Sequence, residues 1–488
     1  MPDKIKVLFA SSEVAPLAMT GGLAEVAGSL PQAISALGHP ATVIMPAYRQ
    51  TLANFKFGVL YRELTVPFGS VELPFSVLEG QGQDGQKVLL IKHDPFFDRD
   101  GLYGEGGTSY PDNPSRFAFF SKAIIETAKR IPGGFDLIVA NDWQTGLVMP
   151  LLSEFGPNAP AGIFIIHNQG FLGLAPAETA ELIGLPESYL GLEGMEYYGQ
   201  LSYLKAGIVY SKAVVTVSPT YAREIQTPEG GNGLDGVLRL HSGKLFGIVN
   251  GVDYVSWNPE TDRFISHNYS RENFNGKAKC KMAVKNQLKL APSDRPLFSM
   301  VSRLTAQKGI SLVVEAGPDL FKLGLDLIIL GTGEPLFEEQ LRDLMALYPA
   351  NMRLILAYDN KLAHQIIAGS DFTLVPSMYE PCGLIQLYSL RYGTIPVVRA
   401  IGGLNDTVRD YAGQNPDGLW DNGFKFSQFQ GPALTRAARR ATELYRTADF
   451  RTMALANMAE DHSWSNSAKD YVKIFKDVLG LSGPAPSL

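Results

Sequence analysis

The chain has 488 residues, and its 43 lysines and arginines against 49 aspartates and glutamates give a formal net charge of −6. This balance argues against nucleic acid or an anionic membrane as a partner, so a negatively charged ligand must be held by a local group of residues. The length and a hydrophobic fraction of 45% predict two or three domains with full cores. The N-terminus leads directly into a strand, no apolar stretch is long enough to span a bilayer, and the two cysteines lie far apart. We therefore expect a cytoplasmic protein without disulfides.

Short apolar runs alternate with helical patterns along most of the chain. In the first half the predicted strands are 7–10, 42–45, 137–140, 163–166 and 214–217, and a hairpin over residues 71–94 extends their sheet. In the second half they are 298–301, 327–330, 354–357, 372–375 and 396–398. Near-continuous apolar strands separated by helices predict parallel sheets covered on both faces, and therefore an α/β chain with two doubly wound domains.

The domain boundary is expected between residues 250 and 259. We place the first domain at residues 1–255 and the second at 256–463, with a polar, poorly periodic loop over residues 262–275. An amphipathic helix is predicted for residues 464–480, followed by a frayed tail at 481–488.

Polar side chains collect where the predicted strands end. In the first domain they include Ser11 to Glu13, Asn141 with Asp142, and His167 with Asn168; in the second they include Ser302 with Arg303, and Ser377 to Glu380. Ligands of open α/β sheets bind outside the carboxyl ends of the strands. If both sheets point these ends at a shared cleft, the chain is either a two-substrate transferase or a domain-closing binding protein.

The stretch from Ser377 to Gln386 places a carboxylate and free backbone amides at the start of a helix predicted to begin near Cys382 or Gly383. A diphosphate fits such amides while Glu380 reaches sugar hydroxyls, although an ordinary acidic cap would use the same residues. Arg303 and Lys308 add two cations at the end of a strand. They suit a diphosphate leaving group, or else form a solvated pair at a helix start.

Other motifs are less specific. Thr20-Gly21-Gly22 follows the first strand and lets the backbone approach a ligand, but taken alone it is better explained as a simple tight turn. Asp142 and His167 end neighbouring strands and offer the carboxylate and imidazole that sugar hydroxyls need. Asp98-Arg99-Asp100 has no third ligand nearby, so we interpret it as loop charge and predict no metal.

Taken together, these residues resemble the bacterial glycogen synthase and plant starch synthase family over nearly the whole chain. The matching segments are 12–16, 20–24, 142–143, 167–168, 198–207, 217–225, 250–253, 302–309, 380–384 and 402–404. The resemblance implies a GT-B fold, with two Rossmann-like domains facing across a deep cleft and the last helix crossing back to the first domain. It also implies transfer of glucose from ADP-glucose to the nonreducing end of glycogen or another α-1,4-glucan, with retention of configuration and without a metal or other cofactor.

The family's functional positions carry over residue by residue. Arg303 and Lys308 would hold the diphosphate, and Glu380 and His167 would grip the glucosyl unit. The positions implied to carry catalysis are Glu380, His167, Asp142, Arg303 and Lys308. Those implied to bind the donor are Met19, Gly21, Gly22, Asn250, Arg303, Lys308, Cys382, Gly383, Leu384 and Ile385. Those lining the acceptor side of the cleft are Tyr103, Asp142 and Asn168.

Some positions depart from the family pattern. Met19 stands where the family has Lys, which removes one cation near the donor. Gln144 replaces His, Glu25 replaces Asp, and Ile385 and Ile401 replace Thr. Two alternatives stay open: a retaining transferase of the same fold with another nucleotide sugar or acceptor, and a catalytically silent glucan-binding protein.

Overall fold

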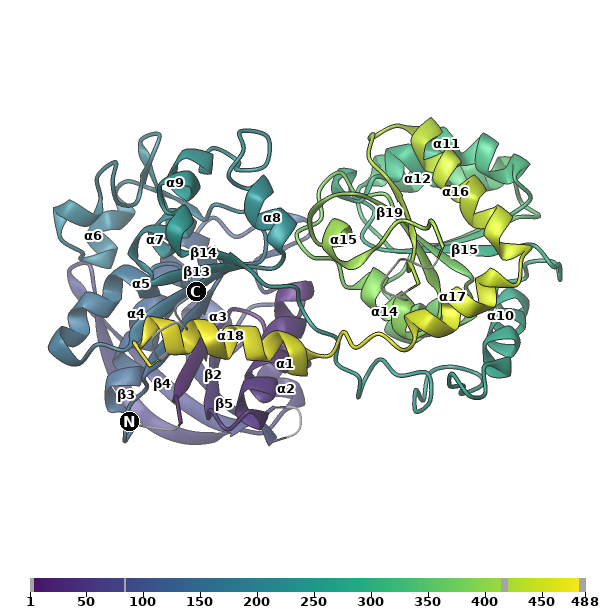
Figure 1. Ribbon diagram of the computed structural model, residues 1–488. Coiled ribbons are helices and arrows are strands. Elements are labelled where there is room, and N and C mark those ends of the chain that lie inside the picture. The colour runs from purple at the N-terminus through teal and green to yellow at the C-terminus, as the bar shows by residue number, and fades with distance from the viewer. Residues whose placement is uncertain (1–3, 83–84, 414–419, 482–488) are drawn as a thin grey trace, which may run out of the picture. The chain divides into compact units, whose positions relative to one another are not determined.

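The structure is a computed structural model of the chain and describes residues 4–82, 85–413 and 420–481 (Figure 1). It divides into two compact units. Unit 1 comprises Met1–Gly251 with Trp464–Leu488, and unit 2 comprises Val252–Ser463. The tail expected at residues 481–488 lies, apart from Leu481, outside the described residues. Within the described segments, none of the helices combines the length and the apolarity that crossing a membrane requires.

Unit 1 is built on a nine-stranded sheet of order β14-β13-β9-β8-β1-β2-β5-β4-β3. Its strands are β1 (Val7–Ala10), β2 (Ala41–Pro46), β3 (Gly58–Phe68), β4 (Val71–Gln81), β5 (Lys87–Lys92), β8 (Leu137–Asn141), β9 (Ala161–Ile166), β13 (Ala213–Thr216) and β14 (Leu245–Gly247). The strands from β14 to β5 pair in parallel, whereas β5, β4 and β3 pair antiparallel. The hairpin expected over residues 71–94 is thus confirmed as β4 and β5.

Helices surround this sheet (Figure 1). They are α1 (Gly22–Ala36), α2 (Arg49–Asn54), α3 (Asp94–Phe97), α4 (Asn113–Arg130), α5 (Val148–Leu151), α6 (Thr179–Ile183), α7 (Tyr203–Tyr210), α8 (Pro219–Glu224), α9 (Asp235–Leu240) and α18 (Trp464–Val478). Unit 1 also holds two small sheets. One pairs β6 (Gly104–Glu105) with β7 (Thr108–Ser109), and the other has three strands in the order β10 (Leu174–Pro176), β12 (Gln200–Ser202), β11 (Glu196–Tyr197). The last helix, α18, packs against α1 through a face that includes buried Tyr471 and Phe475.

Unit 2 holds a six-stranded parallel sheet of order β17-β16-β15-β18-β19-β20. Its strands are β15 (Leu297–Val301), β16 (Asp326–Leu330), β17 (Met352–Ile355), β18 (Phe372–Val375), β19 (Ile395–Arg399) and β20 (Phe424–Phe426). Its helices are α10 (Asn275–Gln287), α11 (Ile310–Lys322), α12 (Pro335–Leu347), α13 (Asn360–Gly369), α14 (Ile385–Arg391), α15 (Gly402–Thr407), α16 (Gly431–Tyr445) and α17 (Asp449–Asn457). In chain order the sheet reads third, second, first, fourth, fifth, sixth, which is the Rossmann arrangement, and the parallel part of unit 1 repeats it.

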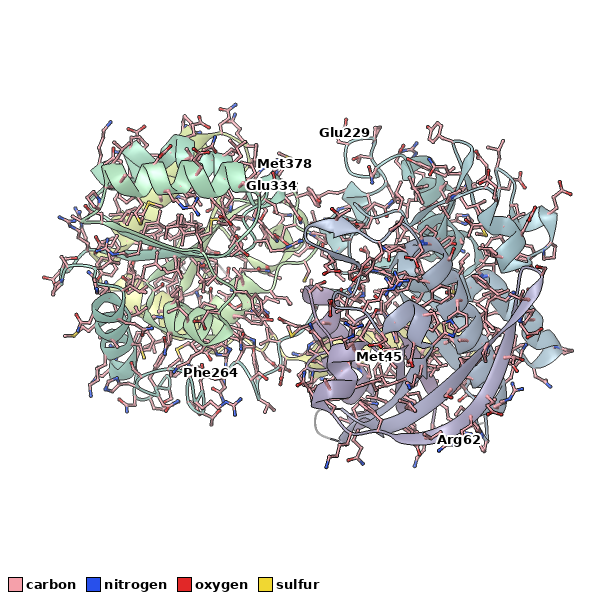
Figure 2. All side chains as sticks on the ribbon, turned by 180° about the vertical axis from the view of Figure 1, so that it is seen from behind. Met45, Arg62, Glu229, Phe264, Glu334 and Met378 are labelled. Atoms are coloured by element: carbon pink, nitrogen blue, oxygen red, sulfur yellow. The ribbon has the colours of Figure 1, made fainter. Side chains whose placement is uncertain are left out.

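The cores explain these elements. Every residue of β16 and of β18 is buried, as expected for strands covered on both faces. Figure 2 shows side chains filling the interior of each unit, with Met45 of β2 completely buried. The prediction missed β3, β14 and β20. The first is largely exposed at the edge of its sheet, and the other two have three residues each, so the sequence offers little apolar signal for any of them.

The loop expected at residues 262–275 is confirmed, since neither helix nor strand lies between β14 and α10. It is nevertheless well anchored in unit 2. Asp262 accepts hydrogen bonds from Tyr392 (2.6 Å) and His364 (2.8 Å), and the ring of Trp257 stacks between His364 and Tyr388. The loop is therefore held by the buried carboxylate of Asp262, and the chain just before it is held by aromatic stacking of Trp257.

Candidate functional site

The ends of β8 and β9 bring Asn141, Asp142 and His167 together in unit 1. The backbone amide of His167 donates to Asp142 Oδ1 (2.7 Å), and its ring Nε2 lies 2.9 Å from Asn141 Oδ1. Because an amide oxygen can only accept, Nε2 carries the proton and Nδ1 is left as an acceptor. Burial lowers the pKa of His167 to about 3, so the ring is neutral near neutral pH.

Asp142 is a buried carboxyl group in an unusual backbone conformation. Burial raises its pKa to about 7; the amides of His167 and Asn168 oppose that rise, and the negative charge of Glu13 adds to it. Its φ of 54° lies in the left-handed region, which costs energy for a residue with a side chain. A strained, partly protonated carboxyl group at a strand end is typical of a functional site.

Tyr103, expected on the acceptor side, lies beside the end of β1. Its hydroxyl donates to Glu13 Oε1 (2.7 Å) and lies 2.8 Å from Ser12 Oγ. The other predicted acceptor residue, Asn168, meets Asp142 through its amide at 3.4 Å. Unit 1 therefore gathers Asp142, His167 and Asn168 in one cluster, while Tyr103 belongs to a second one around Glu13.

The unit 1 residues predicted to bind the nucleotide-sugar donor differ in their exposure to solvent. Gly21 and Gly22 are exposed where α1 begins, and Met19 just before them is 40% exposed. Asn250 is buried, and its Oδ1 has no hydrogen-bond partner within the described residues. An unsatisfied buried amide oxygen is costly and is common at binding sites.

In unit 2 the predicted cluster forms around Glu380. Lys308 Nζ donates to Glu380 Oε2 at 2.6 Å, and Ser377 Oγ donates to the same oxygen at 2.9 Å. Both side chains of the ion pair are largely buried. Within the described residues Glu380 Oε1 meets no donor, and the guanidinium of exposed Arg303 has no hydrogen-bond or ion-pair partner either. One carboxylate oxygen and one cation are thus left to meet a ligand.

The turn that carries Lys308 is held from both sides by residues labelled in Figure 2. Glu334 accepts a hydrogen bond from the amide of Ala306 (3.3 Å), and the amide of Met378 donates to Gln307 O (2.7 Å). These contacts tie the turn after β15 to the loop after β16 through Glu334 and to the loop after β18 through Met378. The strand ends thereby bring Lys308 to Glu380 although 72 residues separate them.

The helix after Glu380 begins later than expected. It starts at Ile385 rather than near Cys382 or Gly383, because Gly383 has a left-handed φ of 73° and the Gln386 side chain donates to the carbonyls of both Cys382 and Gly383. Among the described residues, the amides of Gly383, Leu384 and Ile385 donate to no acceptor. The predicted row of free amides is thus present, but in a loop before a short helix.

Gly402 and Gly403 support this loop. A Cβ on Gly402 would collide with the carbonyl oxygen of Glu380, and one on Gly403 would collide with that of Cys382. The amide of Gly403 also donates to Glu380 O at 3.1 Å. Glycine is therefore required for α15 to pack directly beneath the Glu380 loop.

A hollow of about 440 Å³ lies in unit 1, and Trp143, the residue after Asp142, forms part of its lining. It is lined by Asn113, Pro114, Trp143, Asn232 and residues 170–174, and the ring of Phe171 is 56% exposed. Its volume is within the range of small-molecule sites, and aromatic rings with amides suit saccharides. Sequence reasoning missed this hollow because its residues come from separate loops without any common pattern.

The charged loop at residues 98–100 is occupied by ion pairs. Arg49 contacts both Asp98 and Asp100, and Arg99 contacts Asp112. In the described part of the chain, no three His, Cys, Asp or Glu side chains stand close enough to hold a metal ion. Gln144, one of the departures from the family, is buried, and its Oε1 has no partner among those residues.

Two doubly wound units with polar residues at their strand ends have the architecture of the GT-B class of glycosyltransferases. Residues 6–240 match the family model described as the starch synthase catalytic domain, and residues 284–446 match glycosyl transferases group 1. The chain is 42% identical to the glycogen synthase of Koribacter versatilis (strain Ellin345), covering 98% of this chain and 99% of that protein. It is 43% identical to the glycogen synthase of Anaeromyxobacter sp. (strain Fw109-5), covering 97% and 99%.

A solved structure is also similar over nearly the whole chain. The catalytic domain of starch synthase IV from Arabidopsis thaliana, bound to ADP and acarbose, superposes with a TM-score of 0.90 at 32% identity, covering 98% of this chain and 100% of that one. The chain therefore belongs to the glycogen synthase and starch synthase family, which confirms both the fold class and the resemblance found in the sequence.

Proposed function

We propose that the protein transfers glucose from ADP-glucose to the nonreducing end of an α-1,4-glucan, with retention of configuration and without a metal. The observation that carries this proposal is the Lys308–Glu380 pair at 2.6 Å, with unpaired Arg303 on the same strand-end loop. Two cations suit a diphosphate leaving group, on which negative charge builds as the glycosidic bond breaks. The ligands named for the starch synthase IV structure, ADP and acarbose, favour the same pair of substrates.

Glu380 is suited to bind the glucosyl unit rather than to attack it. Its Oε2 already accepts from Lys308 and Ser377, so the carboxylate is fixed and its Oε1 is left for sugar hydroxyls. A carboxylate neutralised by a lysine is a weak nucleophile, which favours attack by the acceptor hydroxyl on the face that the diphosphate leaves. The C1–phosphate oxygen bond breaks, the C1–O4 bond forms, and the acceptor proton passes to the departing phosphate.

The residues of unit 1 would orient hydroxyl groups. Neutral His167 offers Nδ1 as an acceptor, and Asp142 offers the oxygen that its two amide contacts do not use. The hollow beside Trp143 and Phe171 would hold further glucosyl units of the acceptor chain. Catalysis would then depend on positioning and on charge stabilisation rather than on a covalent intermediate.

The test is incorporation of labelled glucose into glycogen from ADP-glucose or UDP-glucose, in the presence of a chelator. We expect incorporation from ADP-glucose, with α-linkage in the product. Lys308→Ala and Glu380→Ala should abolish it without unfolding the protein, whereas Lys322→Ala should not, because Lys322 forms an exposed ion pair with Asp319. Full activity in both site variants would refute the proposed site.

One observation favours a second candidate. Met19 is an exposed thioether where the family has a cation, so a donor other than ADP-glucose is the alternative. Incorporation from UDP-glucose alone would establish it. Glucan binding without turnover of either nucleotide sugar would instead indicate a silent binding protein.

A further inference from the structure

Glu13 is a buried carboxylate to which the proposed reaction assigns no role. It follows β1 and is 4% exposed. Three donors surround it: Thr20 N to Oε2 (2.5 Å), Thr20 Oγ1 to Oε1 (2.8 Å) and Tyr103 OH to Oε1 (2.7 Å). Burying a carboxylate is costly unless it is fully hydrogen-bonded, and here the bonds come from two separate segments of the chain.

The first segment is the loop that leads into α1. The amides of Val14 and Ala18 each donate to the other's carbonyl oxygen (2.9 Å both), which closes the loop, and Glu13 then binds Thr20 by both its amide and its hydroxyl. The residues beside Thr20 are Met19, Gly21 and Gly22, all assigned to the donor side. The carboxylate thereby holds the backbone that would approach the nucleotide sugar.

The second segment is the loop that carries Tyr103, assigned to the acceptor side. Since the phenol has one proton and donates it to Glu13, it accepts from Ser12 Oγ at 2.8 Å. The backbone carbonyl of Tyr103 is in turn held by Asn113 Nδ2 at 2.8 Å. Tyr103 is thus held both at its backbone and at its hydroxyl group, and Glu13 contacts the hydroxyl group.

We propose that Glu13 is a positioning residue that couples the donor-side loop of residues 19–22 to Tyr103 on the acceptor side. This inference rests on the proposed function, since that function supplies the two sides. In the described part of the chain no hydrogen bond joins Thr20 to Tyr103 directly, so Glu13 is the hydrogen-bonding link between them. A ligand that orders one loop therefore also fixes the Glu13 carboxylate, which accepts hydrogen bonds from the other loop, and such coupling is reciprocal.

The side chain must be an acceptor at both oxygens. In Glu13→Gln one oxygen becomes an NH₂ group. In place of Oε2 it would face the amide of Thr20, donor against donor, and in place of Oε1 it would force the hydroxyls of Thr20 and Tyr103 to accept where they now donate. Loss of a hydrogen bond to a buried charged group is worth about a tenfold change or more in an equilibrium constant. The substitution should therefore disturb one loop directly and the other through it.

The experiment measures affinity for ADP and for maltoheptaose by calorimetry, and KM for each substrate together with kcat. The variants are Glu13→Gln, Thr20→Val, Tyr103→Phe and the Thr20→Val/Tyr103→Phe double variant. The control is Asp98→Asn, which removes an exposed carboxylate bound to Arg49 a few residues before Tyr103. Melting temperatures are recorded for every protein.

Glu13→Gln should weaken binding of both ligands about tenfold or more at a temperature where the variant is folded. Thr20→Val should also weaken the binding of maltoheptaose, and Tyr103→Phe should also weaken the binding of ADP. The fold-loss of affinity in the double variant should be smaller than the product of the two single fold-losses. A purely structural role would lower the melting temperature and leave both affinities unchanged. The control Asp98→Asn should leave the affinity for both ligands unchanged.

Unchanged binding in folded Glu13→Gln, or a loss confined to one ligand, overturns the inference. If Glu13→Gln does not fold, additive losses in the Thr20→Val/Tyr103→Phe cycle overturn it in the same way. A wild-type protein that binds ADP and maltoheptaose but incorporates no glucose contradicts the proposed function instead. In that case the affinities of the variants still decide the coupling.

Discussion

Asp142→Asn should make the protein more stable at pH 8 than the wild type while reducing glucosyl transfer. The wild-type carboxyl group is buried, and burial raises its pKa to about 7. An asparagine keeps the Oδ1 acceptor for the amides of His167 and Asn168, so the backbone contacts survive. The variant removes the cost of burying a charge without removing the hydrogen bonds.

The size of the effect follows from the pKa difference. At pH values between the ordinary pKa of an aspartate and about 7, Asp142 is protonated in the folded state and ionised in the unfolded state, so the folded state binds more protons. Wild-type stability therefore falls as pH rises through this window and levels off above it. At about 1.4 kcal/mol for each pH unit, the variant should gain about 1–3 kcal/mol on the wild type between pH 5 and pH 8.

Differential scanning calorimetry at pH 5 and pH 8 measures this difference. A change of about 1 kcal/mol moves the melting temperature by about 2–4 °C in a domain of this size, so the gap between variant and wild type should widen by several degrees. Asp136→Asn is the control, because its carboxylate accepts the amide of Lys6 (2.7 Å) in a more exposed place. An equal gap at both pH values would show that Asp142 is already ionised at pH 5, and would refute the burial argument.

Two further substitutions test the donor side. Met19→Lys restores the family's cation at an exposed position and should lower the KM for ADP-glucose about three- to tenfold. The decrease should be smaller at high salt, which screens the added charge. An unchanged KM would mean that residue 19 does not approach the diphosphate. Gly402→Ala places a Cβ against the carbonyl oxygen of Glu380 and should lower kcat at least about tenfold by displacing the Glu380 loop. Gly21→Ala is the control, because the space around Gly21 is open and a Cβ there should not displace the backbone. A wild-type kcat in Gly402→Ala would show that the Glu380 loop can shift without consequence.

The alternation of strands and helices was legible in the sequence because parallel strands buried on both faces are continuously apolar. β1 and β18 have the bounds that the apolar runs predicted, and most other predicted strands differ by a residue or two at their ends. Motifs at the strand ends were sufficient to predict the family, because so many glycines and charged residues at fixed positions along the chain form a specific pattern. The exposed edge strand β3 and the three-residue strands β14 and β20 were missed because pairing with a neighbouring strand, and not an apolar pattern, defines them.

The chemistry of the site was determined only by tertiary structure. Their position at strand ends and the family resemblance identified Asp142, His167, Lys308 and Glu380. Nothing in the sequence shows that the ring of His167 is kept neutral or that Lys308 uses only one oxygen of Glu380. Both properties depend on neighbours distant in the chain and on exclusion of water, which a linear pattern does not record. The role of Glu13 is of the same kind: its carboxylate meets a tyrosine 90 residues away, and only the fold brings them together.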